Sequence, residues 1–366
     1  MVNISQFGTS PCNILCMCGM CRQKRKDMLH RKGINYDVGT FARRDEPSRA
    51  TFDPAIVQRE IEIIKNDLHC NAIRISGQEI ARLTLAAEYA LRQGLEVWFS
   101  PSWVDATEQE MLAYLAQCAQ AAELLRQQSS QVIFVVGCEL TFFMHGLVDG
   151  NTAFERINTF MNPWRLLKST LVKGSFNKRL NAFLAQATAI VKETFHGQLT
   201  YASGTWEAVD WTLFDFVGID YYRDKRNTSS YRQTLRNYFQ HGKPVVILEF
   251  GCCTYQGAEE KGSYGWTIVN RNTMPRQLQG AFVRDEHGQA RYMIELLDIF
   301  REEQIEGAFV FTFVIPSYPY SEDPIYDLDM ASYGIVKTCL NQKGQTYKDM
   351  PWEPKESFRQ LAQLYQ

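Results

Sequence analysis

Two acidic residues stand where apolar stretches of the chain end. Glu139 follows the run VIFVVGC within 131–140, and Glu249 follows PVVIL within 244–250. A charge at the end of a buried strand costs free energy unless it is paired or put to use. Two carboxyls flanking one substrate suit glycoside chemistry, in which one protonates the leaving oxygen and the other attacks the sugar carbon or directs a water to it.

The alternation of side chains along a strand predicts which way these acids face. Glu139 shares a face with Val135, and Glu249 shares one with Ile247, so both can point inward at one end of a barrel. The same alternation turns Cys138 away from Glu139. We therefore expect the Cys138 thiol to pack between a strand and a helix.

Four further residues at strand ends are predicted to support the acids: Arg74, Tyr222, Asp220 and Cys138. Arg74, in NAIRISG, is expected beside Glu249, where it would keep the carboxylate ionised and lower its pKa. Tyr222 lies on the same strand face as Asp220, at the end of FDFVGIDYY, and is expected to donate a hydrogen bond to Glu249.

Residues near the other strand ends are candidates for binding the substrate. Tryptophans can serve as stacking platforms for sugar rings, and short polar side chains can hydrogen-bond to hydroxyls. The candidates are Asn35, Asp37, Trp103, Trp206, Trp266 and Phe311.

The elements that position these residues alternate between two types. Eight short apolar segments of strand character occupy 33–40, 71–77, 95–103, 131–140, 198–206, 214–222, 244–250 and 307–313. Amphipathic segments of helical period lie between most of them, over 53–67, 78–93, 106–128, 177–195 and 285–303, and a last helix closes the chain from 355. Asp53 and Thr107 are plausible N-caps, and Gly94 suits the end of a helix.

Eight buried strands alternating with helices predict an α/β fold, the (β/α)8 TIM barrel, with active-site residues at the C-terminal ends of its strands. A doubly wound open sheet is the alternative. The weakest connection is 206–213, which leaves room for only a turn or two of helix between the fifth and sixth strands.

Composition narrows the class of protein further. The 366 residues are 45% hydrophobic, which is enough for a sizeable core, and their net charge of −2 gives no sign of a nucleic-acid or membrane-surface partner. No apolar run approaches the ~20 residues of a membrane span. Ten cysteines without a disulfide-like spacing favour a reducing, cytoplasmic location. A small-molecule or oligosaccharide substrate is expected, and the oligomeric state is not predicted.

The first 30 residues differ from the rest of the chain. Cys12, Cys16, Cys18 and Cys21 precede the basic run RQKRK, with a C-x3-C-x-C-x2-C spacing that matches no standard zinc pattern. We interpret 1–30 as a flexible Cys-rich, basic extension and 31–366 as the catalytic barrel domain. No cofactor or metal is expected, since the adjacent Cys252 and Cys253 cannot easily join Cys138 around one tetrahedral ion.

The pattern of strand ends resembles the clan A glycoside hydrolases, the "4/7" superfamily of retaining (β/α)8 enzymes. The resemblance implies Glu139 as acid/base, Glu249 as nucleophile, Arg74 beside the nucleophile and Tyr222 in contact with it. DFVGIDYY, GAFVFTF and MPWEPKESFRQLAQLY look like segments of these barrels. Over roughly 32–366, phrases such as GKPVVILEFGCCTY and DLDMASYGIVK also resemble bacterial proteins labelled "abortive infection protein".

The sequence departs from the clan A pattern near the acids. Cys138 stands where the clan usually has an asparagine that contacts the sugar 2-hydroxyl, and Phe311 stands where it usually has a tryptophan. The strand-three histidine of many relatives is absent. Three functions therefore remain open: a retaining glycosidase or transglycosidase, another hydrolase, lyase or cyclase on the same barrel, and a non-catalytic defence or binding protein.

Overall fold

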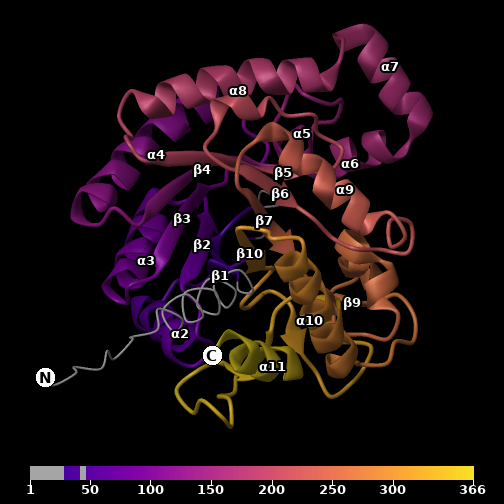
Figure 1. Ribbon diagram of the computed structural model, residues 1–366. Helices are drawn as coiled ribbons and strands as arrows, with labels where there is room; N and C mark the ends of the chain where they lie inside the picture. The colour runs from indigo at the N-terminus through magenta and orange to yellow at the C-terminus, as the bar shows by residue number, and fades with distance from the viewer. Residues whose placement is uncertain (1–28, 42–46) are drawn as a thin grey trace, which may run out of the picture.

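A computed structural model describes residues 29–41 and 47–366, and in it eight parallel strands close into a barrel (Figure 1). The barrel strands are β1 (Arg31–Gly39), β2 (Ala72–Gly77), β3 (Glu96–Pro101), β4 (Val132–Cys138), β5 (Gln198–Gly204), β6 (Val217–Asp220), β7 (Val245–Phe250) and β10 (Gly307–Val310). Neighbours in sequence are neighbours in the barrel, and β10 closes it between β7 and β1. The TIM-barrel prediction and its eight strands are confirmed. The predicted extension 1–30 falls almost wholly outside the described residues.

Helices surround the barrel and cover the outer faces of the strands (Figure 1). The predicted ones are present as α2 (Pro54–Asn66), α3 (Ile80–Arg92), α4 (Glu108–Gln128), α8 (Phe176–Lys192), α10 (Glu286–Glu302) and α11 (Glu356–Tyr365). Asp53 accepts a hydrogen bond from the Ala55 amide at the start of α2, and Thr107 forms a capping box with Glu110 at the start of α4. The chain after α3 turns through Gly94, whose φ of 71° favours glycine.

Several elements were not predicted. Between β4 and α8 the chain forms α5 (Leu140–Phe143), α6 (Ala153–Met161) and α7 (Pro163–Lys173), and α7 projects from the ring of helices (Figure 1). Between β6 and β7 lie α9 (Tyr231–Asn237) and η2 (Tyr238–His241), while the short link from β5 to β6 holds only η1 (Trp211–Leu213). The loops after β7 and β10 contain η3 (Ala258–Glu260), η4 (Gly262–Ile268), β8 (Val269–Asn270), β9 (Gln277–Leu278), β11 (Pro319–Tyr320), η5 (Leu328–Ala331), β12 (Val336–Cys339) and β13 (Trp352–Pro354).

The barrel interior is filled by apolar side chains. This inner layer consists of Ala72, Trp98, Ile133, Val135, Ala202, Phe216, Val246, Leu248 and Phe309, all fully or almost fully buried. A second, larger apolar cluster includes helix residues such as Leu235 and Phe300 and lies between the strands and the helices. The barrel is therefore a packed core, and only its end is open to a ligand.

The inner layer corrects the predicted alternation. On β7, Val246 and Leu248 face inward, whereas the prediction placed Val245 and Ile247 there. The pairing register shifts between Ile219 and Asp220 where β6 meets β7, so one extra β7 residue is accommodated and Glu249 still reaches the barrel mouth. A similar shift on β4, between Val135 and Cys138, has the consequence for Cys138 described below.

Among residues 29–41 and 47–366, no helix is both long and apolar enough to cross a membrane.

Candidate active site

A cavity of about 780 Å³ opens at the C-terminal ends of the strands. Its volume lies within the range of small-molecule sites. Glu139 and Glu249 both line it, with Arg74, Cys138 and Tyr222. The fold thus brings together the two acids that were predicted from the sequence and three of the four residues expected to support them.

Glu249 is held by two donors. Arg74 Nη1 lies 2.9 Å from Glu249 Oε1, and the Tyr222 hydroxyl donates to Oε2 over 3.1 Å. Arg74 is 1% exposed and is itself fixed, because its guanidinium donates to Ser100 Oγ and to Asn35 Oδ1. Both donors interact more strongly with a carboxylate than with a neutral carboxyl.

The close approach of two strand ends beside Glu249 explains why residue 251 is a glycine. A Cβ added to Gly251 would lie 2.3 Å from the Phe311 carbonyl oxygen, closer than real Cβ contacts allow. The ends of β7 and β10 can therefore converge at the mouth only with glycine at this position.

Glu139 follows β4 in an unusual conformation. Its φ of 42° and ψ of 46° are left-handed, a region that a non-glycine residue adopts only at some cost. The Glu139 amide donates to the Ala202 carbonyl over 2.9 Å, and the next amide, of Leu140, donates to the Tyr201 hydroxyl over 2.8 Å. These bonds hold the turn that aims Glu139 at the cavity.

The carboxyl group of Glu139 differs from that of Glu249 in its surroundings. Burial raises the pKa of Glu139 well above its ordinary value, and the negative charges of Asp220, Glu249 and Glu207 raise it further. Among the residues that the structure describes, no side chain hydrogen-bonds to this carboxyl. Glu139 therefore favours its protonated form and faces an open cavity, while Glu249 is a paired acceptor.

Glu207 is a functional candidate that the sequence did not single out. It accepts hydrogen bonds from the Thr141 amide and hydroxyl and from the Tyr201 hydroxyl, at 3.1, 2.7 and 2.9 Å. Burial raises the pKa of Glu207 to about 7. Since Tyr201 also holds Leu140, Glu207 fixes the two residues that follow Glu139. Its position directly after the fifth strand could have pointed to a functional role, but no other feature of the sequence supported that signal.

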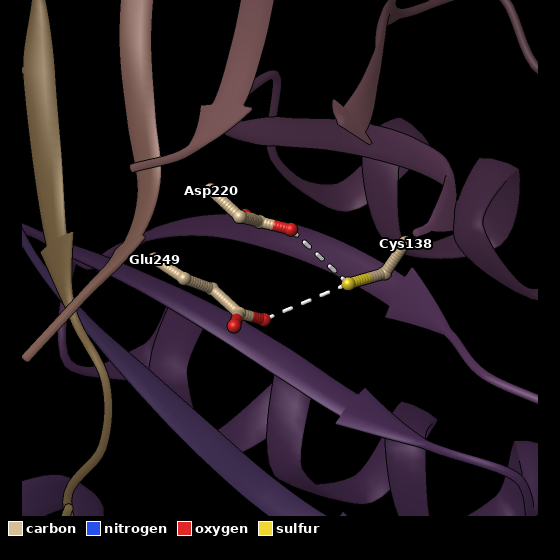
Figure 2. Close-up of side chains that lie close together, drawn as sticks. All are labelled: Cys138, Asp220 and Glu249. Atoms are coloured by element: carbon tan, nitrogen blue, oxygen red, sulfur yellow. Dashed lines mark hydrogen bonds between the residues drawn. The ribbon is translucent and has the colours of Figure 1, made fainter. Parts of the chain in front are cut away.

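The position of Cys138 contradicts the prediction. Its Sγ lies 3.4 Å from Asp220 Oδ2 and 3.6 Å from Glu249 Oε1, inside the mouth (Figure 2). The register shift on β4 turns this side chain inward instead of toward a helix. Burial raises the pKa of the Cys138 thiol well above its ordinary value, as do the charges of Asp220 and Glu249. The residue is thus a weak, neutral donor between two acids.

Asp220 is more deeply buried than the two other acids at the mouth, Glu139 and Glu249. It is 3% exposed, and its Oδ1 has no hydrogen-bond partner, although Arg74 Nη1 lies 3.8 Å away. Burial raises the pKa of Asp220 well above its usual range, with the Glu249 charge as the next cause. Asp220 therefore favours its neutral form.

Metal-ligating atoms do meet at this point. Within the described part of the chain, Cys138 Sγ and one oxygen each of Asp220 and Glu249 lie within 4.8 Å of one another (Figure 2). The Arg74 guanidinium already occupies the cation position beside Glu249 and would repel a divalent ion. The donor set fits proton sharing better than metal binding. Cys252 and Cys253 are buried in the core and do not join it.

The remaining predicted residues lie in three places. Asn35, Asp37, Trp266 and Phe311 line the cavity, although Asn35 also donates its amide to the Leu248 carbonyl over 2.8 Å. Trp206 lines a smaller adjoining compartment. Trp103 packs edge-on against Tyr114, with ring centroids 5.5 Å apart, and is absent from the walls of both.

Comparisons with known proteins support the fold. No family model matches the chain, and no curated protein matches it by sequence. The solved structure of a GH113 β-1,4-mannanase is similar, with a TM-score of 0.57, 13% identity, and coverage of 92% of this chain and 99% of the other. GH113 β-mannanase AaManA from Alicyclobacillus acidocaldarius, in complex with ManMIm, gives a TM-score of 0.56 and 15% identity, with 93% and 98% covered.

A third similar structure comes from a larger protein. A calcium-binding mutant of Bacteroides uniformis β-glucuronidase 2 gives a TM-score of 0.56 at 13% identity, and the match covers 92% of this chain but 34% of that one. At these identities the likeness establishes a shared barrel architecture and not a shared reaction. The resemblance to proteins labelled "abortive infection protein" is not tested by these matches and stays a prediction.

Proposed function

We propose that this protein is a glycoside hydrolase or transglycosidase that uses a retaining mechanism, with Glu139 as acid/base and Glu249 as nucleophile. One observation carries the proposal. A carboxyl that favours its protonated form and has no hydrogen-bond partner among the described residues faces the same cavity as a carboxyl held by Arg74 and Tyr222. The two environments separate an acid from a nucleophile, as two carboxyls with different roles require.

The two steps follow from these environments. In the first, Glu139 gives its proton to the glycosidic oxygen as Glu249 attacks the anomeric carbon, so the leaving group departs as a neutral alcohol and a glycosyl ester forms. In the second, Glu139 removes a proton from a water or an acceptor hydroxyl, whose oxygen attacks the same carbon and frees Glu249. Arg74 and Tyr222 orient Glu249 and stabilise it when the ester bond breaks.

The similar structures supply supporting context. Two are named as β-mannanases and a third as a β-glucuronidase, so β-mannosides and β-glucuronides belong in any substrate panel. The departure at Cys138 argues against simple transfer of a sugar preference. Its thiol faces Asp220 and Glu249 where the clan resemblance implies an amide that reads the 2-hydroxyl.

A second candidate is a different acid/base enzyme on the same barrel, such as a lyase or cyclase. The composition of the cavity wall favours it, because Phe143, Phe154 and Phe311 line the space with few of the amides that usually bind sugar hydroxyls. Such an enzyme would still need the protonated Glu139, and would show no turnover on any glycoside.

The test is a panel of 4-nitrophenyl glycosides that includes β-mannoside and β-glucuronide. We expect the wild type to hydrolyse at least one, with the anomeric configuration retained when the first product is observed by NMR. A 2-deoxy-2-fluoro analogue of the active sugar should label the peptide that contains Glu249. Glu139→Gln should slow hydrolysis of glycosides with poor leaving groups by about 10²–10⁴-fold.

The matched control is Glu322→Gln, which removes an exposed carboxyl away from the cavity and should leave the rate unchanged. An inverted product would exclude the double displacement, and no turnover on any sugar would reject the glycosidase in favour of the second candidate.

A further inference from the structure

A second compartment of about 260 Å³ adjoins the main cavity on one side of Glu139. Glu139 lines both spaces, whereas Glu249, Arg74 and Tyr222 line only the larger one. The wall of the smaller compartment comes mainly from α5, α6, the loop after β5 and the loop after β7. Its size suits one ring rather than a long chain.

Its wall is aromatic. Phe142 stacks on Trp206 with ring centroids 4.4 Å apart, and Phe154 meets Trp266 edge-on at 5.9 Å. Ile157 completes the apolar surface. A flat apolar group can pack between such rings with little loss of free energy from unpaired polar atoms.

One cation, Arg271, stands in this aromatic wall. Its guanidinium carbon lies 4.5 Å from the centroid of the Trp266 ring, and Nη2 donates to the Tyr318 hydroxyl over 2.5 Å. No carboxylate in the described part of the chain pairs with Arg271. Stacking and one hydrogen bond therefore hold the guanidinium in place and leave its other N–H groups available to a ligand.

Arg284 shows that a partly buried arginine in this protein can have several carboxylate partners, unlike Arg271. Arg284 forms ion pairs with Glu286, Asp327 and Asp329, at distances between 2.8 and 3.1 Å. An ordered arginine that faces a cavity without such partners is suited to a planar anion, which it can bind through two parallel hydrogen bonds.

We propose that the smaller compartment binds the leaving group of the substrate, and that this group is an aromatic or similarly flat ring bearing a carboxylate, which Arg271 recognises. The assignment to the leaving group rests on the proposed function, because the acid that protonates the departing oxygen must lie on the leaving-group side of the cleaved bond. Because the pKa of Glu139 is raised, this carboxyl favours its neutral form and does not itself repel an anion in the smaller compartment.

The first test measures binding without turnover. Calorimetric titration should show that 6-hydroxy-2-naphthoate binds the full-length protein about 10-fold more tightly than 2-naphthol, a difference of about 1.4 kcal/mol. Arg271→Gln should remove the preference by weakening only the naphthoate. Ile157→Trp, which fills the compartment, should weaken both probes. The control Arg291→Gln removes an equal charge from exposed α10 surface and should change neither affinity.

The second test separates this inference from the proposed function. For a sugar that is hydrolysed, the kcat/KM ratio of the 4-carboxyphenyl to the 4-nitrophenyl glycoside should fall about 10-fold in Arg271→Gln, and the control Arg291→Gln should leave that ratio unchanged. If no glycoside is hydrolysed but the naphthoate preference depends on Arg271, the proposed function fails and the anion site stands. Equal binding of the two probes, or a preference that survives Arg271→Gln, overturns the inference alone.

Discussion

Two of the charge clusters in the described part of the chain differ in balance. The mouth cluster contains one base and three acids: Arg74, Glu139, Asp220 and Glu249. The C-terminal cluster contains three bases and three acids: Arg284, Lys337, Lys355, Glu286, Asp327 and Asp329. Both contain arginine, aspartate and glutamate, so the count of charges distinguishes them better than burial does.

The balanced cluster binds the end of the chain to the barrel. Lys355, at the start of α11, is fully buried and lies 2.8 Å from Asp329 and 2.9 Å from the Thr254 hydroxyl. Burial would raise the pKa of Glu286, but Lys337, Arg284 and Lys355 outweigh it and lower that pKa. Such a cluster is structural, because each charge has a partner.

The mouth cluster shows the opposite outcome. Burial raises the pKa values of Glu139 and Asp220. The Arg74 charge opposes both shifts, and the Cys138 hydrogen bond also opposes that of Asp220, but neither outweighs burial. Buried acids that outnumber their basic partners and have raised pKa values are typical of sites used for proton transfer. Structural ion pairs perturb pKa values too, so the comparison needs tests that separate activity from stability.

The largest expected effect is on activity. Glu249→Gln should reduce kcat by roughly 10⁴-fold or more for any aryl glycoside that the wild type hydrolyses, because the amide cannot form the glycosyl ester. Asp329→Asn in the C-terminal cluster, measured per folded molecule, should keep kcat within about threefold. A Glu249→Gln variant that retained a tenth of the activity would place the nucleophile elsewhere.

The next effect is on stability and should be specific to the balanced cluster. Asp329→Asn leaves Arg284 and Lys355 short of one negative charge in a buried site, and should lower the free energy of unfolding by about 3–5 kcal/mol. Urea denaturation followed by circular dichroism measures the change. If stability fell by less than about 1 kcal/mol, the cluster would not be the structural element that its balance indicates.

The third effect is a pH dependence of the free energy of unfolding, which arises from Glu207. The pKa of Glu207 is raised from 4.5 to about 7, so the folded state holds this proton more tightly and stability falls as pH rises from 4.5 to 7. The Glu207 contribution to that fall should be about 3 kcal/mol, 2.5 pH units at 1.36 kcal/mol each. Unfolding free energies at pH 4.5, 6 and 8 should show a shallower decline in Glu207→Gln. If the free energy of unfolding declined with pH equally in the wild type and in Glu207→Gln, the pKa of Glu207 would not be raised by folding.

The smallest effect is a change in stability that tests whether the mouth cluster contains more acids than its one base can pair. Asp220→Asn keeps the shape of the side chain but removes a charge that Glu249 repels, so at pH 8 it should raise the free energy of unfolding by about 1 kcal/mol. The gain should shrink as the pH falls, because the raised pKa of Asp220 favours its neutral form in the fold. A destabilised variant at pH 8 would show that Asp220 is paired and not in excess.

Much of this architecture could be predicted because local rules agree with one another. The eight strands are continuous apolar runs, and caps such as Asp53 and Thr107 mark the helices that follow. The α5–α7 segment was missed because its helices are short and α7 exposes Trp164, Leu171 and Val172, so no buried periodicity marks them.

The site could be predicted only in part, for a different reason. Glu139, Glu249 and Arg74 were found because charges are rare at the ends of buried strands. The orientation of Cys138 was wrong because a register shift breaks the two-residue period, and no residue type in VIFVVGC announces that shift. Glu207 and Arg271 depend on partners far apart in the chain, which only the folded structure brings together.

The link between Lys355 and Thr254 has a consequence for protein synthesis. Thr254 follows Glu249 by five positions, yet its buried partner is translated 101 residues later, since 355 − 254 = 101. At 5–20 residues per second a ribosome needs about 5–20 s to add that stretch. The loop after Glu249 thus lacks this buried anchor while most of the barrel already exists, and the nascent chain gains a fully formed mouth only as α11 emerges.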